Sequence, residues 1–250
     1  MAEVNARQIA EDLRRRIQAG EFSPGDRLPS ETQLMAEYGT KSKNVLKNAR
    51  ALLEADGVIV SEHGRGVFVR RFKRYDRHGS RRHLRSRRPT GTSPTQAETQ
   101  AQNIERTLDL LAVETLPAPA DIAGHLNVEP GTPLTCRRHL ISLDGDPAQT
   151  AVSYFVAAVV EGTRIARMES IPGGVHAELA AVLGASLTQA EEILVARMPT
   201  QAEKEILALL PGTPVVELTR IIHAGDRPVE VTKFLFDGSW HRFVYNVPMD

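Results

Sequence analysis

Apolar residues recur at helical spacing along the first part of the chain. In residues 5–19, Ile9, Leu13 and Ile17 are four positions apart, and charged side chains fill most of the places between them. This spacing predicts an amphipathic helix. Asn5 stands where an N-cap is expected, and a glycine follows the last apolar position, which predicts where the helix begins and ends.

Two more short helices are predicted downstream. Ser30 with Gln33 three residues later is typical of a capping box, and the helix that it opens is expected to end near residue 38. Ser42 is expected to cap a third helix over residues 42–57, with apolar residues facing inward. Three short helices with a tight turn before the last indicate a helix-turn-helix.

Two runs of β-branched and aromatic residues follow the third helix. Residues 58–60 and 67–69 are separated by a turn that contains Gly64, Arg65 and Gly66. Such a pattern predicts a two-stranded hairpin with a basic tip. A hairpin in this place would form the wing of a winged helix-turn-helix.

The second half of the chain contains an internal repeat. A Pro-Gly-Thr-Pro turn and a later Gly-Asp turn occur twice, so that Pro130 precedes Pro211 by 81 positions and Pro147 precedes Pro228 by 81. Each copy predicts a short helix followed by an antiparallel hairpin. A helix over 175–183 and a strand over 192–197 are expected between the copies, so the domain is predicted to be α+β around a mainly antiparallel sheet.

Charge is distributed unevenly between the two halves. Lys+Arg and Asp+Glu are 31 each, but residues 1–90 hold 20 basic and 11 acidic residues, which leaves 11 basic and 20 acidic for the rest. This asymmetry indicates that residues 1–90 bind a polyanion. Residues 72–102 read as a linker rich in arginine and then in polar residues, whose arginines either contact DNA phosphates or form a solvated hinge.

Composition excludes several other classes. The single cysteine, Cys136, rules out a disulfide framework or a cysteine-based metal site, and it is expected to be a packed small residue. No run of about 18 apolar residues and no signal-like start occurs, so a cytoplasmic protein with no membrane partner is expected. No metal and no cofactor are expected, and we find no catalytic motif; the four scattered histidines at 125, 176, 223 and 241 are expected at the surface or at helix edges.

The first seventy residues resemble the winged helix-turn-helix of GntR-type bacterial transcription regulators. The segments PGDRLPSE, SKNV and GRGVFV carry this resemblance, in that order. It implies a domain over residues 1–71 in which the start of the third helix reads bases in the major groove and the wing enters the minor groove. The DNA contacts it implies are Arg27, Ser42, Lys43, Asn44, Lys47, Arg65 and Gly66.

Residues 103–250 resemble the UTRA effector domain of the HutC subfamily, which has a chorismate-lyase-like fold. The two PGTP turns, the Ser-Tyr-Phe after the first hairpin and a glycine pair before the middle helix carry this resemblance. It implies a pocket between the sheet and its helices for a small metabolite, often an anion. The matching positions are Arg137, Arg138, His139, Ser153, Tyr154, Gly174, Glu230 and Thr232. Ala151 replaces a glutamate that sugar-phosphate-binding relatives carry, which argues against a sugar phosphate.

Together the two resemblances imply a transcriptional regulator, most often a repressor in this family. A homodimer would bind a palindromic operator in double-stranded DNA, and an effector in the rear domain would lower the operator affinity. Two alternatives stay open at this point. One is an architectural DNA-binding protein that ignores all ligands, and the other is an enzyme with a lyase-like rear domain.

Overall fold

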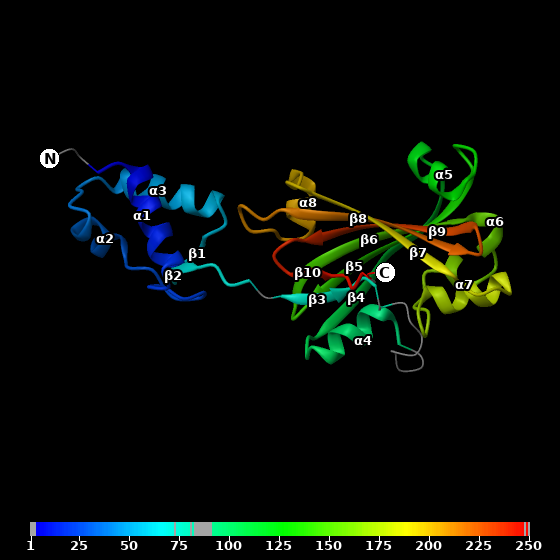
Figure 1. Ribbon diagram of the computed structural model, residues 1–250. Coiled ribbons are helices and arrows are strands. Elements are labelled where there is room, and N and C mark those ends of the chain that lie inside the picture. Colours follow the sequence, from blue (N-terminus) through cyan, green and yellow to red (C-terminus); the bar gives the residue numbers. More distant parts are fainter. Residues whose placement is uncertain (1–3, 73, 81, 83–91, 248, 250) are drawn as a thin grey trace. The chain divides into compact units, whose positions relative to one another are not determined.

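The computed structural model describes residues 4–72, 74–80, 82, 92–247 and 249. The chain divides into two compact units, the first formed by residues 1–73 with 209–213 and the second by the rest. Figure 1 shows the elements of each unit. We describe each unit by itself.

The first unit is a winged helix-turn-helix, as predicted. Its elements are α1 (Ala6–Gln18), α2 (Glu31–Glu37), α3 (Lys43–Ala55), β1 (Ile59–Glu62) and β2 (Gly66–Val69). The N-cap expected at Asn5 and the capping box expected at Ser30 are both formed, and Asn5 also forms a capping box, with Gln8. Ser42 is the N-cap of α3, but its side chain makes no capping hydrogen bond; its backbone N–H donates instead to the Thr40 hydroxyl at 3.2 Å.

The core of this unit lies between the three helices and the base of the wing. Ile9 and Leu13 from α1 pack with Leu46 and Leu53 from α3, and all four are buried. Truncating a buried leucine of this kind to alanine costs about 2–5 kcal/mol. The wing strands pair antiparallel next to this core, so the core fixes where the wing emerges.

The second unit is built on one antiparallel sheet. Its strands are ordered β4-β5-β6-β9-β8-β7, and a separate parallel pair joins β3 to β10. The strands are β3 (Tyr75–His78), β4 (Arg106–Pro117), β5 (Pro133–Leu143), β6 (Asp146–Val156), β7 (Gln189–Arg197), β8 (Val215–Ala224), β9 (Arg227–Asp237) and β10 (His241–Val244). The helices are α4 (Pro94–Ala101), α5 (Ala120–Leu126), α6 (Ala157–Val160), the 3-10 turn η2 (Arg164–Ala166), α7 (Val175–Leu183) and α8 (Gln201–Ile206).

Helices cover the two faces of this sheet differently. On one face, α5 packs over Cys136 and Val231, which confirms Cys136 as a packed core residue. On the other face, α6, η2 and α7 pack over Phe155 and Ile222, and β3 packs over Ile141. In Figure 1, α5 lies on the side of the sheet opposite α4 and α7. Alternation along each strand therefore decides which side chains face α5 and which face α7.

The predicted repeat is visible as two equivalent hairpins. β5 and β6 form the first, β8 and β9 form the second, and a short helix, α5 or α8, precedes each. The helix expected over 175–183 is α7, and the strand expected over 192–197 lies within β7. Because β6 pairs with β9, the two hairpins join edge to edge at the centre of the sheet.

The linker expected over residues 72–102 needs correction. Strand β3 and helix α4 both lie within it, and both belong to the second unit. Tyr75 is buried, and its hydroxyl donates to Glu98 of α4 at 2.6 Å, so the two elements brace each other. The sequence did not predict β3 and α4 because both segments are mostly polar and each makes its apolar contacts through single residues, so neither shows a periodic pattern. The arginines expected at 81, 85, 87 and 88 lie outside the described residues.

Within the described part of the chain, no helix is long and apolar enough to cross a membrane. The same residues hold no cluster of three or more His, Cys, Asp or Glu side chains that could bind a metal ion.

Candidate DNA-binding surface and effector site

The start of α3 presents a polar, exposed surface. Lys43, Asn44 and Lys47 are all exposed there, and Ser42 is half-buried. The Lys43 side chain is 79% exposed, and its ammonium group lies 3.8 Å from the Glu31 carboxylate of α2. At this distance and exposure the pair contributes little to stability, so the lysine can exchange its carboxylate partner for a phosphate or a base at little cost.

The wing tip brings a second basic group to this unit. The Arg65 side chain is 73% exposed, pairs with Glu62, and lies over the Phe68 ring with 5.6 Å between the guanidinium carbon and the ring centroid. Gly66 has a φ of +125°, and a Cβ built on it would lie 2.6 Å from Nε of Arg27. The positive φ favours glycine at position 66, and a side chain there would displace the Arg27 guanidinium, which packs directly against the wing backbone.

Three predicted effector residues meet on the α7 side of the sheet. Ser153 of β6 and Thr232 of β9 are paired across the two strands, and their hydroxyl oxygens are 2.8 Å apart. The Thr232 hydroxyl also donates to Oε1 of Glu230, which is fully buried. Strand alternation places residues 230 and 232 on the same face as 153, so one polar patch crosses the central strand pair.

Two residues that sequence reasoning missed complete this patch. Arg220 of β8 donates to Oε1 of Glu230 at 3.2 Å, and Nε2 of His176, in the first turn of α7, lies 2.9 Å from Oε2. Burial alone would raise the pKa of Glu230, but His176, Arg220 and the Thr232 hydroxyl together lower it to about 2. We call these five residues, Ser153, His176, Arg220, Glu230 and Thr232, the polar cluster.

Three buried arginines lie near the polar cluster, and each pairs with a carboxylate: Arg77 with Glu192, Arg82 with Glu98 and Arg220 with Glu230. Arg77 of β3 is buried and forms a two-pronged ion pair with Glu192 of β7, which is the strand partner of Arg220. Arg82 is buried as well, and burial together with the nearby Arg77 lowers its pKa to about 10. Within the described residues, the Nε atoms of Arg82 and Arg220 have no hydrogen-bond partner. Buried guanidinium donors that lack an acceptor favour an anionic ligand.

His139 and Gly174 lie beside the polar cluster. Burial, with Arg137 and Arg106 nearby, lowers the pKa of His139 to about 4, so this ring is neutral near pH 7. Gly174 is the N-cap of α7 with a φ of +87°, two residues before His176. This positive φ, which favours glycine, lies where the chain turns into the helix that carries His176.

The guanidinium donors of Arg137, by contrast, are used in hydrogen bonds to backbone carbonyl oxygens. Its guanidinium donates to the carbonyl oxygens of Arg164, Ile165, Arg167 and Glu169 at 2.7–3.3 Å. These bonds hold the η2 segment against β5. Arg137 therefore shapes the wall of the site and has few donors left for a ligand.

Arg138 and Tyr154 lie on the opposite face of the sheet. Arg138 pairs with Glu114 of β4 and is partly exposed, and Tyr154 packs with the core under α5. Arg138 follows Arg137 on β5 and Tyr154 follows Ser153 on β6, so strand alternation points their side chains to the opposite face. The prediction that these two residues share a pocket with Ser153 and Glu230 is therefore wrong.

Two other expectations also need correction. The hypothesis that connector arginines contact phosphates fails for Arg77 and Arg82, which are 1% and 7% exposed inside the second unit. The histidines at 176 and 241 are expected at the surface or at helix edges. His176 does lie at the start of α7, where it contacts Glu230, but His241 is buried against the Phe236 ring, with 4.6 Å between centroids.

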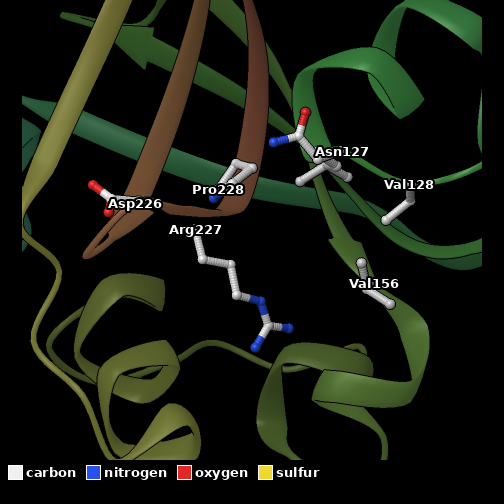
Figure 2. A pocket seen from close by; sticks show the side chains of 7 residues that line it. Asn127, Val128, Val156, Asp226, Arg227 and Pro228 are labelled. Carbon is white, nitrogen blue, oxygen red and sulfur yellow. The ribbon is translucent and has the colours of Figure 1, made fainter.

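A separate groove lies at the turn between β8 and β9, away from these residues. It has a volume of about 510 Å³ and is lined by Leu126, Asn127, Val128, Val156, Asp226, Arg227 and Pro228. Figure 2 shows the Arg227 side chain extending away from Asn127 and Val128. None of the predicted effector residues lines it, and it lacks the buried charges that the polar cluster has.

Comparisons with known proteins agree with this division of the chain. Residues 5–69 match the bacterial regulatory proteins of the gntR family, and residues 101–242 match the UTRA domain. An uncharacterized HTH-type transcriptional regulator of Rhizobium meliloti (strain 1021) is 32% identical over 92% of this chain and 89% of its own length. The mannosyl-D-glycerate transport/metabolism system repressor of Escherichia coli K12 is 39% identical over 64 residues, 26% of each chain.

A solved structure extends the likeness to the whole fold. The crystal structure of a GntR-family transcriptional regulator covers 98% of both chains with a TM-score of 0.67 and 28% identity. The winged helix-turn-helix and the antiparallel sheet thus occur together in a known regulator. This protein belongs to the GntR family of bacterial transcription regulators: its first unit binds DNA, and its second is a UTRA domain that binds a small-molecule effector.

Proposed function

We propose that this regulator is a homodimeric repressor of a palindromic operator. Lys43, Asn44 and Lys47 would meet base edges and phosphates in the major groove, with Ser42 at the helix start. Arg65 and Gly66 would enter the minor groove from the wing, and Arg27 beside them would reach the backbone. The exposure of Lys43 and Arg65 supports these roles, and the likeness to a named repressor supports the sign of regulation.

The effector is an anionic metabolite that binds at the polar cluster. The observation that carries this proposal is the buried Arg220 guanidinium, which shares Glu230 with His176 while its Nε has no partner in the described part of the chain. A carboxylate or phosphate would accept from such donors, and the Ser153 and Thr232 hydroxyls and the amides after Gly174 lie close by to orient the ligand. Ala151 leaves no carboxylate at this position of β6 for the hydroxyls of a sugar.

Binding of the effector is expected to lower operator affinity. Coupling of this kind amounts to about 1–3 kcal/mol, or a five- to 150-fold change in affinity. A second effect of the ligand would be thermal stabilisation, because it binds the folded state only.

The test has two steps. Thermal unfolding of the purified protein is first followed against a panel of carboxylates and phosphorylated metabolites, and each compound that raises the midpoint is then added to the protein bound to DNA from upstream of its own gene. We expect one anion to stabilise the protein and release the DNA. Sequence-selective binding that no metabolite alters would favour the ligand-independent architectural protein, and chemical turnover of the stabilising compound would favour the enzyme.

A further inference from the structure

Arg50 interrupts the apolar side of the recognition helix. The buried residues of α3 are Leu46, Ala49 and Leu53, and Arg50 follows Leu46 by one turn and precedes Leu53 by three residues. An apolar residue would suit this position, yet a half-buried arginine occupies it. Partial burial of a guanidinium group costs free energy unless a charge or a hydrogen bond compensates for it.

The Arg50 side chain lines a groove within the first unit. The groove has a volume of about 440 Å³ and lies between the wing, the start of α2 and the turn before α2. Arg27 and Ser30 contribute one wall, Glu62 and His63 contribute the wing wall, and Glu31 lies at the start of α2. The groove is therefore bounded by the wing on one side and by the helix-turn-helix on the other.

The acidic residues of the groove already have basic partners. Glu31 lies near Lys43, and Glu62 pairs with Arg65. Among the described residues, no carboxylate lies within ion-pairing distance of Arg27 or Arg50. Arg27 and Arg50 thus line the groove beside Glu31 and Glu62 but have no ion pair of their own among the described residues, so both guanidinium groups are available to an external anion.

The geometry of winged-helix docking identifies that anion. In a winged-helix complex the recognition helix occupies the major groove of the DNA and the wing enters the adjacent minor groove. The DNA strand that separates these two DNA grooves must then pass between the helix and the wing. What this strand presents is its sugar-phosphate backbone. The groove lined by Arg27 and Arg50 lies between these two elements.

We propose that Arg50 is a DNA-contacting residue that binds a backbone phosphate in this groove. This proposal rests on the placement of α3 and the wing on DNA proposed above. Because a phosphate contact carries no base information, Arg50 sets affinity and register for every sequence alike. Its interaction with DNA also compensates for the half-buried charge that α3 carries in the absence of DNA.

The test compares Arg50→Leu with Arg15→Leu. Leucine suits the apolar side of α3. Arg15→Leu is the matched control, because it also removes one positive charge but from an exposed site on α1 outside the groove. Binding is measured across a range of salt concentrations on two probes, a duplex that the wild-type protein selects from a random pool and an unrelated duplex. Thermal unfolding shows that each variant is folded, and Arg50→Gln replaces Arg50→Leu if the leucine variant does not fold.

We expect the Arg50 variant to bind both duplexes five- to 20-fold more weakly near physiological salt. The plot of log affinity against log salt should become shallower by about 0.9, the value for one lost phosphate contact. A salt dependence and affinity equal to those of Arg15→Leu would overturn the proposal, as would a loss confined to the selected duplex with an unchanged slope. A wild-type protein that selects no duplex would instead contradict the placement of α3 and the wing on which the proposal rests.

Discussion

Val152 and Lys233 lie opposite each other on the central strand pair of the sheet, and they are 81 positions apart. The Pro-Gly-Thr-Pro turns have the same separation, so the two residues are equivalent members of the repeat. A local two-fold axis therefore passes between them. The irregularity after Ile141 in the first hairpin recurs after Ile222 in the second, again 81 positions later. The sheet thus consists of two equivalent halves joined through identical strands.

The departures from this symmetry coincide with the polar cluster, where we propose that the effector binds. Arg220 and Glu230 of the second half correspond to His139 and Gln149 of the first, and Thr232 corresponds to Ala151. Only the second half therefore carries the buried ion pair. A duplicated scaffold needs no such difference for folding, which supports the view that the charges were retained in one half for a ligand.

Thr232→Val should weaken effector binding and leave DNA binding intact. The change keeps the size of the side chain and removes one hydroxyl from the polar cluster, which costs about 1–2 kcal/mol of affinity, or roughly tenfold in Kd. Calorimetric titration with the stabilising anion measures this loss. Arg138→Ala is the matched control from the other face of the same sheet. Equal affinities for the wild type and Thr232→Val would place the effector elsewhere, and a large loss for Arg138→Ala would restore that residue to the site.

Gly66→Ala should damage the wing more than Gly64→Ala does. Both glycines have positive φ, but the φ of +72° at Gly64 is close to the left-handed helical region, whereas the φ of +125° at Gly66 is far from it, so alanine strains the backbone by about 1 kcal/mol at position 64 and by about 2–3 kcal/mol at position 66. Only at position 66 does the new methyl group meet a side chain, since it would lie 2.6 Å from Nε of Arg27, whereas nothing lies within 4 Å of the Cβ position at residue 64.

The measurement is operator affinity together with thermal stability for both glycine variants. We expect Gly66→Ala to lose more stability than Gly64→Ala, and to lose several-fold more DNA affinity because Arg27 is displaced. Equal DNA affinities in the two variants would show that the position of Arg27 against the wing is unimportant for binding.

Periodicity was sufficient to predict most of the fold. The capping boxes, the wing and both hairpins are encoded by neighbouring residues, so local pattern predicts them well. The polar cluster could be predicted only in part, because Arg220 and His176 meet Glu230 through pairing between distant segments. One signal was available: a charged residue at position 220 and another at 230 interrupt β-rich runs that are otherwise apolar. Strand alternation also separates Arg138 and Tyr154 from Ser153, but only the observed register shows which face bears the site.

Replacing both residues of the buried ion pair of Arg77 and Glu192 should leave the second unit stable but weaken its response to the effector. Arg77 lies in β3, the first strand of the second unit, and Glu192 is the strand partner of Arg220 in the polar cluster. Glu192→Gln leaves the buried Arg77 charge without a carboxylate and should destabilise the unit by about 3 kcal/mol. The double replacement Arg77→Met with Glu192→Leu removes both charges and should recover much of that loss.

The double variant should nevertheless respond weakly to the effector. β3 is the first element of the second unit after residues 1–73 of the DNA-binding unit, so its ion pair with β7 links the polar cluster to the segment of chain that leads into the DNA-binding unit. Release of DNA by the effector is measured beside thermal unfolding. A stable double variant with a normal effector response would show that this ion pair plays no part in the coupling.

His241 should make the protein less stable as the pH falls below 6.5. Burial, with Arg77 and Arg82 nearby, lowers its pKa to about 3, although its hydrogen bond to the Asp237 carbonyl opposes this shift. Between this pKa and the ordinary value of 6.5 the unfolded state binds the proton and the folded state does not, so stability rises with pH across that range. The loss from pH 6.5 to pH 5 is about 1–2 kcal/mol.

His241→Phe keeps an aromatic ring beside Phe236 and Tyr75 and should flatten this part of the curve. The control variant His125→Gln, at a half-buried position on α5, should not flatten it. Denaturant unfolding at a series of pH values measures the difference, and parallel curves for the wild type and His241→Phe would show that His241 does not titrate on unfolding.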